Sequence, residues 1–197
     1  MKNMMKKIMT VTLLFAIIGT SLSIGNVQAA SNESKAKKYL DAASKDCKKI
    51  MDTIDASWYY QVYSADEYSG SAILDFYASD VGIPKSKVKS IIKKKYGEND
   101  WAGQAACIQV LSYNLGIVHT YYSDKGTFKK IKKNLENAKK ECKKIKGSKK
   151  KKYVKYYNAV NKYYRYVYSP TGSYLGLEAK KDSLNTGIDD AKDALSW

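Results

Sequence analysis

Apolar residues recur every three or four positions through nearly the whole 197-residue chain, and this spacing limits the fold more than any other feature. One such stripe is formed by Leu40, Ala43, Cys47, Ile50 and Ile54. The period places these side chains on one face of an α-helix, whereas a half-buried strand needs strict alternation, which no long segment has. We therefore expect helices over residues 31–63, 69–79, 84–96, 101–123, 128–145, 149–168 and 173–197.

These helices predict an all-α fold. A hydrophobic content of 44% is enough for a packed core. The connections are short, which favours neighbouring helices that run in opposite directions. We expect an antiparallel helical bundle of about seven helices, two of them short.

The first 29 residues have the pattern of a secretory signal peptide. Lys2, Lys6 and Lys7 give a positively charged start, and residues 8–18 form an apolar run that is shorter than the roughly 20 residues of a membrane-spanning helix. Val27-Gln28-Ala29 fits the rule of small residues before a cleavage site, so we expect cleavage after Ala29, with Ala30 as the neighbouring option. Residues 30–197 then form a single helical domain.

This leader indicates a secreted protein that is extracellular or loosely associated with the cell wall. The residue directly after the cleavage site is alanine and not the cysteine that a lipid anchor needs, so a lipid anchor is not expected. The short leader and the lack of a second anchor favour a Gram-positive bacterium as the source.

Basic residues are concentrated in one segment. Residues 125–165 contain 17 lysines and arginines against two acidic residues, a net charge of +15, within a chain whose total is +16. Such a surface can bind a polyanion by releasing its counterions. We expect contact with an anionic polymer such as teichoic acid, or with an anionic membrane surface, through Lys129, Lys130, Lys132, Lys133, Lys139, Lys140, Lys143, Lys144, Lys149, Lys150, Lys151 and Lys152.

Two other interpretations of the lysines stay open. A lysine-rich helical face also keeps a protein soluble. Lysine, asparagine and tyrosine are all encoded by A/T-rich codons, so a low-GC genome raises their number. Codon bias would spread lysine evenly, however, whereas here the lysines are segregated in residues 125–165.

The helix over 149–168 carries seven tyrosines. A stripe of Tyr153, Tyr157, Val160, Tyr164 and Val167 follows the helical period, so we assign these residues to the core. Aromatic rings on a surface can stack on sugars or bases. The tyrosines that the stripe leaves for such an aromatic surface are Tyr156, Tyr163 and Tyr166.

No residue pattern points to catalysis. His119 is the only histidine, and neither a nucleophile elbow, a phosphate-binding loop nor a metal-ligand spacing accompanies it. We expect no catalytic residues, no cofactor and no metal site. Two of the three cysteines, Cys47, Cys107 and Cys142, can pair in an oxidising exterior, but we favour buried free thiols.

Residues 71–96 resemble a DNA-binding helix-turn-helix. Ala78, Gly82, Val88 and Ile91 have the spacing of that motif, and lysines lie on its second helix. The resemblance covers only this segment, and any two helices that meet at a corner need the same residues. Because we expect an exported chain, we interpret the segment as such a corner.

The leading hypothesis is thus a secreted, non-catalytic protein that associates electrostatically with anionic envelope polymers. An extracellular protein–protein interaction or structural module is the first alternative, with the long first helix and the tyrosine-rich helix as its surfaces. A membrane-active, toxin-like protein is the second, because residues 128–145 carry lysines opposite an apolar face. Salt separates the first two, since only polyanion binding weakens as salt rises.

Overall fold

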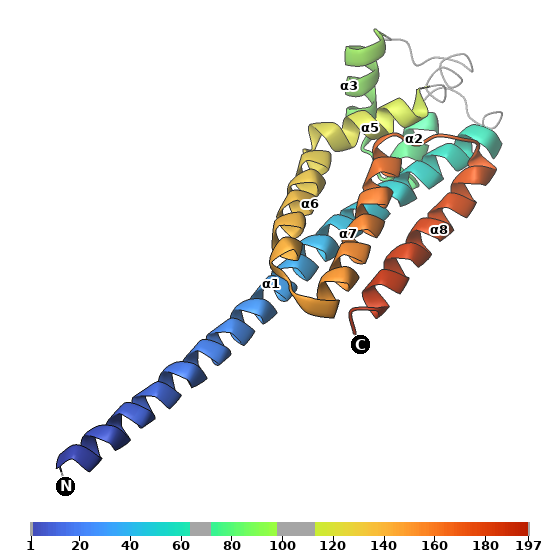
Figure 1. The fold of residues 1–197 in the computed structure, drawn as a ribbon. Coiled ribbons are helices and arrows are strands. Elements are labelled where there is room, and N and C mark those ends of the chain that lie inside the picture. The colour runs from blue at the N-terminus through green and yellow to red at the C-terminus, as the bar shows by residue number, and fades with distance from the viewer. Residues whose placement is uncertain (1, 64–71, 98–112, 197) are drawn as a thin grey trace.

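In the computed structural model, residues 2–63, 72–97 and 113–196 are described, and within them the chain forms seven helices and no strand. The all-helical prediction is confirmed. Figure 1 shows α1 (Lys2–Tyr63), α2 (Ala72–Ser79), α3 (Lys85–Tyr96), α5 (Asn114–Asp124), α6 (Thr127–Lys144), α7 (Gly147–Tyr168) and α8 (Tyr174–Asp193).

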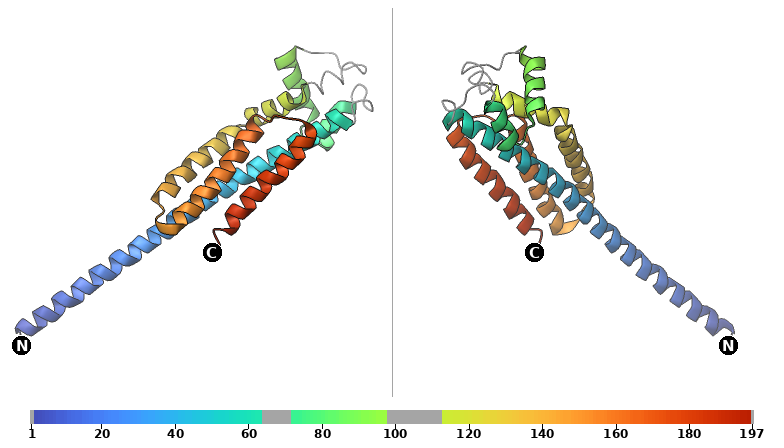
Figure 2. Two further views of the ribbon diagram at one scale, coloured as in Figure 1. Left: turned by 45° about the vertical axis from the view of Figure 1, so that its right-hand side comes forward. Right: turned by 180° about the vertical axis from the view of Figure 1, so that it is seen from behind.

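The long helices form a bundle. α1 packs against α6, α7 and α8, and α7 lies between α6 and α8. In Figure 1 α1 passes behind α6 and α7, and in the rear view of Figure 2 it lies in front of them. The expected stripe on α1 is confirmed, because Leu40, Ala43, Cys47, Ile50 and Ile54 are all buried.

α1 begins much earlier than the sequence predicted. The expected start near residue 31 is wrong in the structure, since the helix runs from Lys2 to Tyr63 without a break. No proline lies in this stretch to end a helix. The first half of α1 extends away from the bundle in Figure 2. Among the side chains that the structure describes, the first to enter the core is Ala36.

The short helices α2, α3 and α5 lie together at one end of the bundle (Figure 1). Asn114 of α5 is buried there, and its side-chain oxygen accepts hydrogen bonds from the hydroxyls of Ser57 and Tyr77. Buried polar groups need such partners. This cluster ties α5 to both α1 and α2. The first half of the helix expected over 101–123 lies outside the described residues.

The cysteines of α1 and α6 are free thiols. Cys47 and Cys142 are both buried and unpaired, and Cys107 lies outside the described residues. Burial raises the pKa of the Cys47 thiol to about 12, and the neighbouring Asp46 adds to the shift. Where the structure describes side chains, no helix has an apolar stretch long enough to cross a membrane.

Candidate functional site

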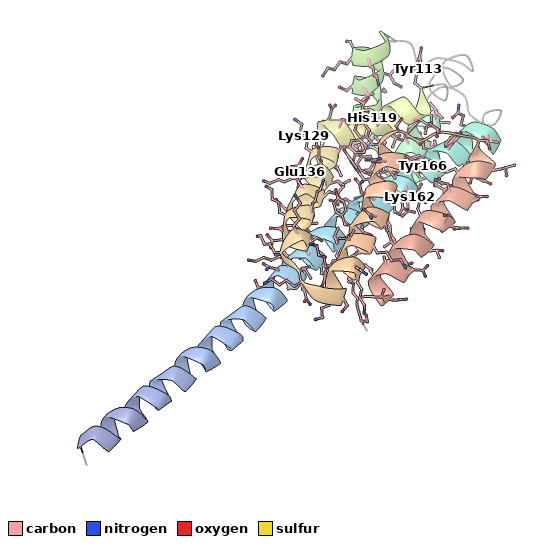
Figure 3. The ribbon with its side chains drawn as sticks, viewed as in Figure 1. Tyr113, His119, Lys129, Glu136, Lys162 and Tyr166 are labelled. Carbon is pink, nitrogen blue, oxygen red and sulfur yellow. The ribbon has the colours of Figure 1, made fainter. Side chains whose placement is uncertain are left out.

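The lysines predicted to bind a polyanion lie on α6 and at the start of α7. α6 buries the stripe of Phe128, Ile131, Leu135, Ala138 and Cys142, mainly against α1. Most side chains at the other positions of α6 are exposed, among them Lys129 and Glu136, which are labelled in Figure 3. The apolar face that a membrane-active helix would insert into lipid is therefore already covered by the bundle.

Three of the twelve lysines hold acidic partners. Lys130 pairs with Asp46 of α1 at 2.9 Å. Lys149 pairs with Glu33 of α1 at 3.0 Å, and Lys144 pairs with Glu141 of its own helix at 2.8 Å. Within the described part of the chain, no carboxylate lies within ion-pair distance of the other nine, which are Lys129, Lys132, Lys133, Lys139, Lys140, Lys143, Lys150, Lys151 and Lys152.

The tyrosines predicted for an aromatic surface lie elsewhere. Tyr156 is 0% exposed and Tyr163 is 1% exposed, so their assignment to the surface is wrong. The hydroxyl of Tyr156 donates to Asp41 of α1 at 2.6 Å, and that of Tyr163 donates to Asn185 of α8 at 3.1 Å. These partners let two tyrosines enter the core with their polar ends satisfied.

Tyr166 is partly buried on the side of α7 that faces α8. The ammonium group of Lys180 lies 5.7 Å from the centre of its ring, which is a cation–π contact. Its hydroxyl donates to the backbone oxygen of Thr171 at 3.3 Å. Tyr166 is thus occupied by contacts within the protein, and it lies apart from the lysines of α6 (Figure 3).

Tyr157 and Tyr164, which the sequence assigned to the core, line a groove between α6 and α7. One hollow of about 330 Å³ is lined by Lys139, Cys142, Lys143, Lys150, Val154, Tyr157 and Asn158. A second, of about 500 Å³, is lined by Lys132, Leu135, Glu136, Lys139, Tyr157, Asn161, Tyr164, Arg165 and Tyr168. Each of these two tyrosines is next to a predicted one in sequence, and the sequence alone does not indicate which tyrosine of each pair is buried.

An aromatic cluster closes the end of this groove near α5. The ring of His119 stacks on Phe128 at 5.1 Å, and Tyr168 packs edge-on against both rings at 5.1 Å. Burial and the nearby charge of Lys95 lower the pKa of His119. A neutral imidazole suits this packing role. Among the described residues, no group of three His, Cys, Asp or Glu side chains is placed to hold a metal ion.

The segment that resembles a helix-turn-helix does form two helices at a corner. The turn between α2 and α3 contains Gly82, whose φ of +72° suits glycine. Val88 and Ile91 of α3 are buried, while Lys87 and Lys89 are exposed. Lys85 of α3 pairs with Asp75 of α2, so this basic side chain links the two helices of the corner.

The fold and the site together define an all-helical protein with a basic outer face and a tyrosine-lined groove. Comparisons with protein families, curated proteins and solved structures find no match to this chain.

Proposed function

We propose that this chain is a secreted, non-catalytic protein of a Gram-positive bacterium that associates electrostatically with an anionic polymer, such as teichoic acid, or with an anionic membrane surface. The observation that carries the proposal is the face of nine lysines without a carboxylate partner in the described chain. A polyanion that settles on such a face releases counterions from both surfaces. Association is then favourable at low salt and weak at high salt.

The proposal includes an antiparallel arrangement of the long helices and a single mature domain over residues 30–197. Residues early in α6, such as Lys132, line the groove with residues late in α7, such as Tyr168, which supports opposite directions for these two helices. The described core begins at Ala36, so cleavage after Ala29 would remove none of it.

The test is a pull-down of the mature protein on isolated Gram-positive cell envelopes at low and at high salt. We expect binding at low salt that is lost at high salt. Charge reversal across the nine unpaired lysines as a set should weaken the low-salt binding. An absence of binding at both salt concentrations would contradict the proposal, and the lysines would then be a solubility feature.

A protein–protein interaction module remains the second candidate because apolar side chains are exposed at one end of the bundle. Leu175 at the start of α8 is 71% exposed, and Val62 at the end of α1 is 51% exposed. Where exposed apolar groups gather into one contiguous patch, they favour a protein partner. Binding of a partner through them would survive high salt, which separates this candidate from the first.

A further inference from the structure

The two hollows between α6 and α7 form one continuous groove. Lys139 and Tyr157 line both of them, so the hollows adjoin at these two side chains. Lys150 lines one end and Tyr168 lines the other. With a rise of about 1.5 Å per residue, the α7 wall between them is about 27 Å long. The groove is therefore long enough to hold several repeating units of an extended chain.

The walls of the groove combine cations with apolar and aromatic groups. Its basic residues are Lys132, Lys139, Lys143, Lys150 and Arg165, and among the described residues of the lining only Glu136 is acidic. None of the four lysines pairs with a carboxylate in the described chain. Between them lie the rings of Tyr157 and Tyr164, together with the side chain of Val154.

This combination of groups suits a polymer that carries both charged groups and uncharged carbon units. Lysine and arginine side chains bind phosphate groups by charge-assisted hydrogen bonds. A tyrosine ring offers an apolar face and a polar hydroxyl, which suits the C–H and O–H groups of a sugar or polyol. A lipid surface is flat and would meet the outward lysines of α6 before it met a groove.

We propose that the α6–α7 groove binds one strand of a linear polymer of phosphates joined by sugar or polyol units. The cations of the groove hold the phosphates, and Tyr157 and Tyr164 contact the carbon units. This inference rests on the proposed function and specifies where on the protein the anionic polymer binds. It places the specific contacts in the groove, away from the outward face of α6.

The test uses two triple variants of the purified protein that change the same charge on the same helix. The groove variant is Lys132→Gln, Lys139→Gln and Lys143→Gln. The matched control is Lys129→Gln, Lys133→Gln and Lys140→Gln, which are exposed outside the groove lining. Affinities for poly(glycerol phosphate) of defined length are measured by calorimetry at low salt.

We expect the groove variant to lose about 100-fold in affinity, since each lysine near an anionic partner contributes about a factor of five. The control should lose less than about threefold. Equal losses in the two variants would overturn the groove while leaving the electrostatic proposal intact. A wild-type protein that binds no polyanion would contradict both.

A second pair of variants tests the aromatic contact. Tyr157→Leu should lower affinity for poly(glycerol phosphate) about tenfold. This is the size of the loss when an aromatic side chain that stacks on a base is removed from a nucleic-acid-binding protein. Tyr157→Phe should retain it. Neither change should affect binding of inorganic polyphosphate with the same number of charges, which has no carbon units.

Two results would overturn the sugar or polyol assignment. One is an equal loss of polyphosphate binding in Tyr157→Leu. The other is tighter binding of single-stranded DNA with the same number of phosphates. Far-ultraviolet circular dichroism checks that Tyr157→Leu is folded. If it is not, Tyr164→Leu replaces it, because Tyr164 is the other ring assigned to the carbon units.

Discussion

At the residue scale, the hydroxyl of Tyr156 is the most informative polar group of the core. It is buried with its ring, and it donates to the carboxylate of Asp41 at 2.6 Å. Burial and this bond to Asp41 raise the pKa of the phenol. The bond links α7 to α1 at a point that the packing of apolar groups alone does not determine.

Replacing Tyr156 by Phe should destabilise the fold by about 1.5–3 kcal/mol, the range for a hydrogen bond to a charged group. The ring stays in place, so the loss measures the bond to Asp41. The control is Tyr166→Phe. The hydroxyl of Tyr166 donates to the backbone oxygen of Thr171 at 3.3 Å in an exposed position. That change should stay within about 0.5 kcal/mol. Urea unfolding measures both, and equal effects would contradict the assignment.

The carboxyl group of Asp41 should make the free energy of unfolding depend on pH in the acidic range. Burial opposes its ionisation, but hydrogen bonds from Lys37 and Tyr156 and the charge of Lys192 outweigh burial, so its pKa is lowered. A lowered folded-state pKa means that the stabilisation is complete above the ordinary value, about 3.9, and is lost as the pH falls through the folded value.

The variant Asp41→Asn should therefore be less stable than wild type at pH 7. The difference in unfolding free energy should shrink as the pH drops below about 4, because the wild-type carboxyl then loses its charge. Urea titrations between pH 2.5 and 7 measure this difference. A difference that stays constant across this range would show that the ionised form of Asp41 has no part in it.

At the element scale, the sequence predicted the helices over α2, α3, α6, α7 and α8, but it missed the early start of α1 and the buried face of α7. The predicted stripe of Tyr153, Tyr157, Val160, Tyr164 and Val167 and the observed one share three positions. The observed stripe uses the preceding tyrosines at its second and fourth positions, namely Tyr156 and Tyr163.

The difference had no local signal in the sequence. Tyrosine occupies both 156 and 157, and both 163 and 164, so hydrophobicity favours neither register. The choice depends on Asp41 and Asn185, which satisfy the buried hydroxyls and lie more than twenty residues away in sequence. On α6 the prediction was correct because lysine, asparagine and glutamate fill the other positions and leave one apolar face.

The glycine that begins α7 should be needed for its backbone conformation. Gly147 has a φ of +68°, where a side chain adds strain of about 1–2 kcal/mol. Gly147→Ala should destabilise by about that amount. Gly187, inside α8, has an ordinary helical backbone and open space at the position of a Cβ atom. Gly187→Ala should stabilise by about 0.5–1 kcal/mol, so thermal unfolding of the two variants should shift in opposite directions.

At the scale of the whole molecule, acidic residues of α1 form ion pairs with lysines of neighbouring helices. Asp46 pairs with Lys130 of α6, while Asp52 and Asp55 pair with Lys181 of α8. Asp189 of α8 pairs with Lys48 of α1 and not with the lysine-rich helix. These four aspartates pair with lysines of other helices, and within the described chain nine lysines of α6 and α7 are left without a carboxylate partner.

This arrangement gives a prediction for the salt dependence of binding. For a single-stranded polyanion, the logarithm of the binding constant falls with the logarithm of salt concentration by about 0.7 per phosphate neutralised. Five groove cations therefore predict a slope of about −3.5, whereas all nine unpaired lysines would give about −6. The slope is measured with poly(glycerol phosphate) from 20 to about 300 mM salt.

The two triple variants of α6 then show which lysines contribute to this salt dependence. The groove variant should reduce its magnitude by about 2, because three phosphate contacts are lost, and the control variant should leave it unchanged. A wild-type slope near −6 with equal reductions would place the polymer across the whole lysine face. A slope near zero would mean that counterion release does not drive binding, and exposed apolar residues such as Leu175 would become the surface to test.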